Sequence, residues 1–150
     1  MNNYFDIKVS DNETSCIFSN NYSPLERIIL SANGNLQKIL SAYFNTTISV
    51  IIKDNFKVDN NTIIRQSIMK CKNIIVCYMN SKITILHGDI TINGDIAIGQ
   101  IFQKMRKVPN FKLHQIEKSK DSFQRKYTLC TEQLRCEIIE TFPFNNCQKL

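Results

Sequence analysis

Apolar residues recur at helical spacing in three parts of the chain. Residues 23–26, Ser-Pro-Leu-Glu, read as a helix start, with a serine N-cap, a proline in the first turn and a glutamate that completes a capping box. This helix is expected to run through Leu30. The Asn- and Gly-containing segment 32–35 predicts a turn. The apolar spacing that follows predicts a second helix to about Phe44, and the same spacing predicts a third over residues 98–105.

Runs rich in β-branched residues predict six strands. The first begins at Thr46 and is expected to end at the natural turn Asp54-Asn55. The second and third form a long hairpin, and Asn73 in its Lys72-Asn73 turn is expected to take the positive φ. The predicted strands cover residues 46–53, 62–71, 74–86, 111–118, 123–131 and 134–142.

These elements predict the α+β class. Hairpins dominate and strands do not alternate with helices, so the sheet should be antiparallel, with the helices gathered at one face or end. The third helix would lie across this sheet, and Val108-Pro109-Asn110 should end it. Residues 1–21 are polar and mixed and carry no predicted element. With 4 Gly and 3 Pro in 150 residues the chain shows no linker, so residues 1–150 are expected to form a single domain.

The chain is basic. Its 19 Lys and Arg residues against 13 acidic residues give a net charge of +6, which attracts anions. The basic residues are scattered and their densest stretch, residues 104–107, is short, so no nucleic-acid partner is expected. No run of about 18 apolar residues and no secretory leader is visible, so we expect a soluble protein that does not enter a membrane.

Sequence patterns for metal, nucleophilic and nucleotide chemistry are missing. No CxxC pair occurs, so we expect reduced, mostly buried thiols and no metal site. His87 and His114 stand at no ligand or nucleophile spacing, and no GxSxG or glycine-rich phosphate loop is present. The six cysteines are Cys16, Cys71, Cys77, Cys130, Cys136 and Cys147.

Two charged residues fall on apolar rows of predicted strands. Side chains alternate between the faces of a strand, which puts Glu140 beside Ile138 and Phe142. The same count puts Arg65 beside Ile63 and other apolar residues. Buried charges need a partner. Either Arg65 and Glu140 pair with each other or reach solvent, or they form an anion pocket in which Arg65 clamps a carboxylate and Glu140 meets a hydroxyl or ether at the far end.

Seven motifs follow one another along residues 23–144. They are Ser-Pro-Leu-Glu-Arg-Ile-Ile-Leu at 23–30, Asn-Gly-Asn-Leu at 33–36, Arg65, Tyr78 to Ser81, Ile98-Gly99-Gln100, Arg125-Lys126-Tyr127, and Ile-Glu-Thr-Phe-Pro at 139–143. In order and spacing they resemble the chorismate pyruvate-lyase family, and most closely its plastid and cyanobacterial branch.

The resemblance implies a six-stranded antiparallel sheet whose ligand is buried under helical flaps. It implies conversion of chorismate to 4-hydroxybenzoate and pyruvate by a monomer that needs no metal or organic cofactor. Arg65 would bind the ring carboxylate, and the backbone N–H groups of Leu36 and Ile98 would add donors to it. Glu140 would face the ring-oxygen end and carry the proton. A plastid-encoded chain would act in the stroma, and otherwise in the cytoplasm.

The chain departs from the family pattern at two places. The acidic-Gly-Thr-Leu-Thr turn of the family is here Asn33-Gly34-Asn35-Leu36-Gln37, and the glutamate before Ser81 is Asn80. Under the resemblance, both changes would alter the flap that covers the ligand and the rate of the reaction. Two alternatives to the enzyme follow: a non-catalytic sensor domain of the same fold that binds a small aromatic acid, and an interaction or nucleic-acid module recruited through charge.

Overall fold

The protein is described here by a computed structural model over residues 3–92 and 94–143. Its helices are α1 (Pro24–Ser31), α2 (Leu36–Phe44) and α3 (Ile98–Met105). Its strands are β1 (Phe5–Val9), β2 (Thr14–Phe18), β3 (Ile48–Asp59), β4 (Thr62–Cys71), β5 (Ile74–Ile85), β6 (Asn110–Lys118), β7 (Ser122–Cys130) and β8 (Leu134–Pro143). The predicted α+β class is confirmed.

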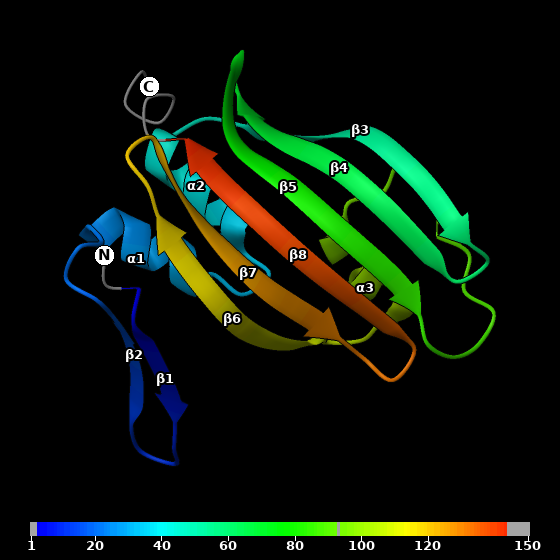
Figure 1. The fold of residues 1–150 in the computed structure, drawn as a ribbon, viewed down its shortest axis with the longest axis horizontal. Coiled ribbons are helices and arrows are strands. Elements are labelled where there is room, and N and C mark those ends of the chain that lie inside the picture. The colour runs from blue at the N-terminus through cyan, green and yellow to red at the C-terminus, as the bar shows by residue number, and fades with distance from the viewer. Residues whose placement is uncertain (1–2, 93, 144–150) are drawn as a thin grey trace.

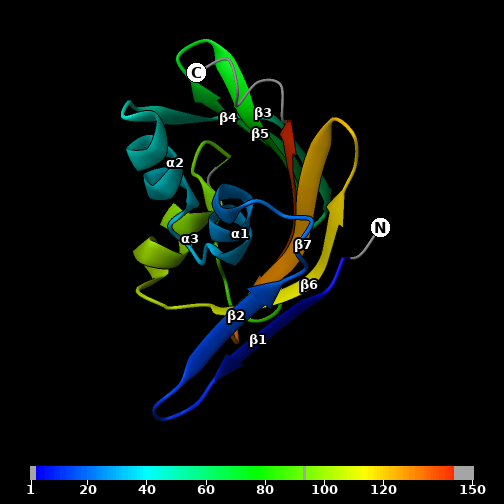
Figure 2. The ribbon, with the colours of Figure 1, turned by 90° about the vertical axis from the view of Figure 1, so that its left-hand side faces the viewer.

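Six strands form one antiparallel sheet in the order β3-β4-β5-β8-β7-β6. The last strand, β8, inserts between β5 and β7 and so joins two hairpin units into a continuous surface (Figure 1). The three helices lie on one face of this sheet, as Figure 2 shows. The predicted sheet, with helices gathered on one side, is therefore confirmed.

Helices α1 and α2 begin where the sequence predicts. At α1 the Ser23 hydroxyl accepts a hydrogen bond from the Glu26 N–H at 3.2 Å, and the Glu26 carboxylate accepts one from the Ser23 N–H at 2.8 Å. This is the expected capping box. Helix α2 ends at Asn45, which takes left-handed backbone with φ 54°, and it packs against β3 and β4.

Strand β3 is longer than predicted. Asp54-Asn55 was expected to end it, but pairing with β4 continues to Asp59 through register shifts at Ile52/Asp54 and Lys57/Asp59. A bulge absorbs an extra residue without ending the ladder, so turn-forming residues can lie inside a strand. The bulge leaves Asn55 opposite Arg65.

One other local expectation was wrong. In the β4–β5 turn Lys72, and not Asn73, takes the positive φ, at 56°. Helix α3 covers the predicted residues and ends ahead of Val108-Pro109-Asn110. Its last turn also has a left-handed C-cap, in which the Arg106 N–H bonds the Gln103 and Phe102 carbonyls.

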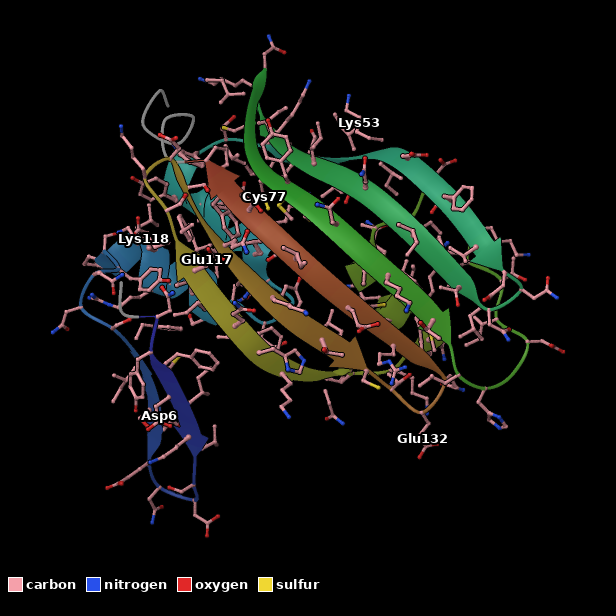
Figure 3. The ribbon with its side chains drawn as sticks, viewed as in Figure 1. Asp6, Lys53, Cys77, Glu117, Lys118 and Glu132 are labelled. Atoms are coloured by element: carbon pink, nitrogen blue, oxygen red, sulfur yellow. The ribbon has the colours of Figure 1, made fainter. Side chains whose placement is uncertain are left out.

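The N-terminal segment forms a hairpin arm that the sequence reading missed. Strands β1 and β2 pair with each other, from Phe5↔Phe18 to Val9↔Thr14, in a sheet of their own. The arm projects beyond the main sheet (Figures 1 and 2) and carries Asp6 on its surface (Figure 3). Only its base packs on the body, where Phe18 is buried.

The core fills the space between the helices and the inner face of the sheet. Cys71, Cys77 and Cys136 are buried in it as free thiols, Cys130 is part-buried and Cys16 is exposed. The expectation of reduced, mostly buried thiols is confirmed for these five residues, and Cys147 lies outside the described residues. The apolar core comprises mainly Leu30, Leu40, Ile83, Ile101, Phe102, Ile116, Leu134, Ile138 and Phe142.

None of the described helices is long and apolar enough to cross a membrane.

Candidate functional site

A cavity of about 260 Å³ lies between the inner face of the sheet and the first turns of α2 and α3. Strands β3, β4, β5, β7 and β8 contribute its floor. The charged side chains that line it are Arg65, Arg125 and Glu140, which sum to one net positive charge. Its other polar side chains include Ser67, Ser81, Tyr127, Gln37, Gln100 and Gln103.

The strand register fixes how these groups are arranged. One row of paired residues runs Arg65, Ser81, Ile138 and Tyr127 across β4, β5, β8 and β7, and the next runs Ser67, Met79, Glu140 and Arg125. Arg65 and Glu140 therefore lie on the same face, two strands and one row apart. Strand spacing of about 4.8 Å and a rise of about 3.4 Å per residue put their Cα atoms roughly 12 Å apart. Both side chains line the same cavity.

Arg65 joins the sheet to the start of α3. Its side chain is 1% exposed, and Nη1 donates to the Ile96 carbonyl at 2.6 Å while Nε donates to Asn55 Oδ1 at 3.4 Å. Burial lowers the pKa of Arg65, and the nearby Cys136 and Asp95 oppose this shift. Arg125 is paired with Glu140, and Arg65 is the other cation among the described residues that line the cavity; the carboxylate of Asp95 acts on it from outside this lining.

Glu140 is held in a buried ion pair. Arg125 Nε donates to Glu140 Oε1 at 2.6 Å, and the Tyr127 hydroxyl donates to Oε2 at 2.8 Å. Arg125 and Glu140 are 1% and 3% exposed, and the guanidinium lies 4.3 Å from the centre of the Tyr127 ring. Both carboxylate oxygens thus accept charge-assisted or phenolic hydrogen bonds, the geometry of an ionised acceptor.

Burial and the ion pair shift the pKa values of the two groups that bond Glu140. Burial alone would lower the pKa of Arg125, but the charge of Glu140 and the hydrogen bond to it raise it above its ordinary value. Burial, followed by the Glu140 charge, raises the pKa of the Tyr127 hydroxyl well above its usual range. Tyr127 therefore stays protonated at neutral pH and acts as a donor.

The first turns of α2 and α3 point open helix ends at the cavity. Leu36 and Ile98, the first residues of these helices, both line it. Neither helix has a side-chain cap: the Asn35 side chain bonds the Asn33 N–H instead, and the cap position of α3 is Ala97. Uncapped N–H groups and the positive end of the helix dipole favour an anion.

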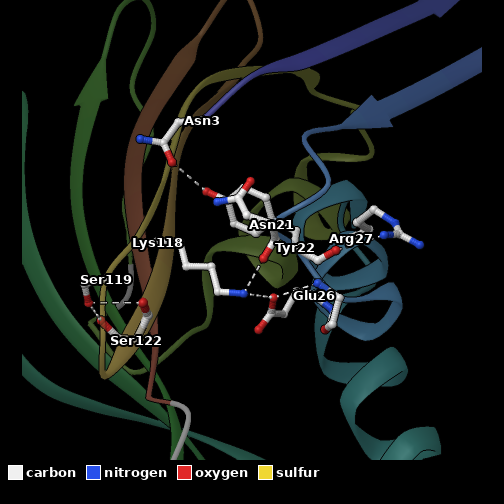
Figure 4. A network of polar contacts seen from close by, with 9 residues as sticks. Asn3, Asn21, Tyr22, Glu26, Arg27, Lys118, Ser119 and Ser122 are labelled. Carbon is white, nitrogen blue, oxygen red and sulfur yellow. Dashed lines mark hydrogen bonds and ion pairs between the residues drawn. The ribbon is translucent and has the colours of Figure 1, made fainter. Parts of the chain in front are cut away.

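A polar network anchors α1 beside the sheet. Lys118, at the end of β6, donates to Glu26 Oε1 at 2.8 Å and to the Asn21 carbonyl at 2.5 Å (Figure 4). Its ammonium also lies 5.5 Å from the centre of the Tyr22 ring. Burial, with the charges of Glu26 and Glu117, raises the pKa of Tyr22 to about 12. The network holds α1 in place. Helix α1 leads into α2, whose first turn lines the cavity.

Each predicted site residue lies at the cavity: Arg65, Glu140, Leu36 and Ile98 all line it. The expectation that Arg65 and Glu140 pair with each other or reach solvent is wrong. Glu140 pairs with Arg125 instead, and Arg65 and Glu140 are both buried. The strand order, which places β7 beside β8, decides this.

Arg125 and Tyr127 are the site residues that the sequence reading did not assign. Arg125 Nη1 also donates to the Ala32 and Leu30 carbonyls, at 2.6 and 3.2 Å, so it ties the end of α1 to the sheet. The alternation of Phe123, Arg125 and Tyr127 on the inner face of β7 was the available signal. It has the same form as the pattern that singled out Arg65.

No group of three or more His, Cys, Asp or Glu side chains within the described residues could hold a metal ion. The arrangement instead offers a cationic clamp, two open helix ends and an oriented carboxylate around an apolar floor. Comparison with known proteins adds nothing to this assignment: no family model matches the chain and no curated protein matches it.

Proposed function

We propose that the protein is a chorismate pyruvate-lyase that converts chorismate to 4-hydroxybenzoate and pyruvate. The observation that supports this most is that Arg65 and Glu140 come from separate strands to line one cavity, with their Cα atoms roughly 12 Å apart. The order of sequence motifs that resembles this family suggests the substrate, and we propose that it binds in this cavity.

In this proposal the ring lies over β5. Arg65 binds the ring carboxylate with charge-assisted hydrogen bonds, and the N–H groups at Leu36 and Ile98 add donors to the same anion. The apolar Met79 and Ile138 side chains pack on the ring. The cavity excludes water from the ring and holds the enolpyruvyl group close to its reactive conformation.

The reaction balances without an added reagent. The ether C–O bond between the ring and the enolpyruvyl group breaks, the adjacent hydroxyl-bearing ring carbon loses its hydrogen, and the departing fragment gains it and leaves as pyruvate. Aromatisation of the ring drives the step. The protein holds the reacting groups in position and stabilises charge in the transition state, and these two effects account for much of the rate enhancement in such reactions.

The ion pair changes the role expected of Glu140. A neutral carboxylic acid could donate to the ether oxygen, but a carboxylate already bonded by Arg125 and Tyr127 is an acceptor. Glu140 is therefore better suited to accept a hydrogen bond from the ring hydroxyl, which the product retains as a phenol. This would orient the ring so that the hydrogen to be moved faces the enolpyruvyl carbon.

One assay tests the proposal. Purified protein is incubated with chorismate, and 4-hydroxybenzoate and pyruvate are quantified by chromatography; we expect equal amounts. Arg65→Ala removes a charged clamp and should lower kcat/KM by about 10²-fold or more. Arg135→Ala, which removes an exposed arginine from the same strand as Glu140, should leave the rate unchanged. Absence of both products from wild-type protein would reject the lyase.

One observation favours a second candidate, a non-catalytic binding domain for an aromatic acid. Arg125 offsets the charge of Glu140, and the charged side chains of the described lining sum to +1, which matches a monoanion such as 4-hydroxybenzoate better than the dianion chorismate. Calorimetric titration with 4-hydroxybenzoate, run beside the chorismate assay, separates the two. Binding of this acid without turnover of chorismate establishes the sensor.

A further inference from the structure

Among the fully buried side-chain polar atoms of the described residues, one at the cavity lacks a hydrogen-bond partner. Ser81 Oγ is buried, on a residue 5% exposed, and makes no hydrogen bond. Burying a hydroxyl unpaired is costly, so such groups are rare in folded proteins. Ser81 also lines the cavity, where a molecule in the cavity could bond it.

The position of Ser81 decides which end of a ligand it meets. It pairs directly with Arg65 across β4 and β5, and side chains opposite each other in an antiparallel pair have Cβ atoms roughly 5 Å apart. Glu140 lies on the next row and the next strand, where it pairs with Met79. The hydroxyl therefore belongs to the arginine end of the cavity.

Arg65 alone does not complete this end. Its Nε and Nη1 already donate to Asn55 and to the Ile96 carbonyl, which reduces the N–H groups that can face a ligand. A carboxylate has two oxygens and about four acceptor sites. A second donor beside the guanidinium would bond the oxygen that Arg65 leaves exposed.

We propose that Ser81 is a ligand-binding residue, whose hydroxyl donates a hydrogen bond to the ring carboxylate held by Arg65. The inference rests on the proposed function only in that the cavity takes a ring carboxylic acid. It names Ser81 as a determinant of selectivity: with the arginine it selects ring acids over ring amides and esters, because a hydrogen bond to a charged acceptor is stronger than one to a neutral acceptor.

The proposal predicts opposite effects on binding and on stability. Ser81→Ala should weaken binding of 4-hydroxybenzoate by about tenfold to a hundredfold, measured by calorimetric titration. The same variant without ligand should have an unchanged or higher thermal midpoint, because it removes an unpartnered buried hydroxyl. A serine with a structural role would instead lose stability when truncated.

Two further variants and a second ligand make the test specific. Ser81→Thr keeps a hydroxyl and should keep most of the affinity, whereas Ser81→Cys keeps the size but only a weak donor and should behave like Ser81→Ala. Lys82→Gln, at the exposed position of β5 that follows Ser81, is the control and should change neither property. With 4-hydroxybenzamide as ligand, the loss caused by Ser81→Ala should be clearly smaller.

The outcomes separate the two proposals. If wild-type protein binds 4-hydroxybenzoate and Ser81→Ala binds it equally well, Ser81 is not a ligand-binding residue, while the proposed function stands. Equal losses for the acid and the amide, or a lower thermal midpoint of the ligand-free variant, also overturn the role of Ser81. If wild-type protein binds neither chorismate nor 4-hydroxybenzoate, the proposed function fails and this inference fails with it.

Discussion

Removal of the Arg125 guanidinium should show how strongly the buried ion pair is coupled to the fold. Arg125→Met keeps the length and much of the volume of the side chain but leaves Glu140, 3% exposed, without its cation. It also removes the hydrogen bonds to the Ala32 and Leu30 carbonyls at the end of α1. Breaking one half of a buried pair costs about 3–5 kcal/mol.

The magnitude is large for a domain of this size, whose total stability is expected to be about 5–15 kcal/mol. Glu140→Gln removes the opposite charge and should cost a comparable amount, since it leaves a buried guanidinium. The double variant removes both charges together and keeps an amide for Tyr127. It should therefore lose only about 1–3 kcal/mol, mainly from the two unpaired carbonyls.

Urea unfolding followed by circular dichroism at pH 7 measures all four proteins of this cycle. The expected signature is strong non-additivity, with the double variant more stable than either single variant. Single substitutions that each cost less than about 1 kcal/mol, or costs that simply add, would refute the reasoning. The result bears on function, because the same carboxylate faces the cavity.

Three further outcomes follow from the structure. Lys118→Met breaks the largely buried pair with Glu26 and the hydrogen bond to the Asn21 carbonyl, and should lower the urea-unfolding free energy by about 1–3 kcal/mol; a loss below about 0.5 kcal/mol would contradict an anchoring role for this network. Stability should fall between pH 10 and 12, because the unfolded chain ionises Tyr22 near pH 10 whereas the fold raises its pKa to about 12; Tyr22→Phe should lessen the fall. In a Cys147→Ser background, a thiol reagent at pH 8 should label exposed Cys16 first and Cys136, with a pKa of about 12, last.

Local sequence signals identified most elements because they act over a few residues. The capping box at Ser23 and Glu26 and the turn at 32–35 depend on contacts within one helical turn, which the sequence contains in full. The arm was missed because its strands are five residues each and mix polar with apolar residues. The bulges in β3 were missed because they depend on pairing with β4.

The face on which Arg65 and Glu140 lie could be read from strand alternation. The partner of Glu140 was also within reach of the sequence, because β7 and β8 are consecutive strands joined by a tight turn and their register puts Arg125 opposite Glu140. The pairing of β8 with β5 has no such local signal, since residues far apart in the sequence make it. That pairing brings Glu140 to the cavity that Arg65 lines, and this part of the site required coordinates.

Helices α1, α2 and α3 differ in where their first turns find partners. The side chains of Ser23 and Glu26 cap the start of α1, whereas α2 and α3 begin without a side-chain cap. A carboxylate bound at the cavity would accept hydrogen bonds from the first turns of both helices and so act as their shared cap. The first turns of α2 and α3 would then become more ordered when the ligand binds. Amide hydrogens at residues 36–38 and 98–100 should exchange with solvent more slowly once the acid is bound, while those in the first turn of α1 should not respond.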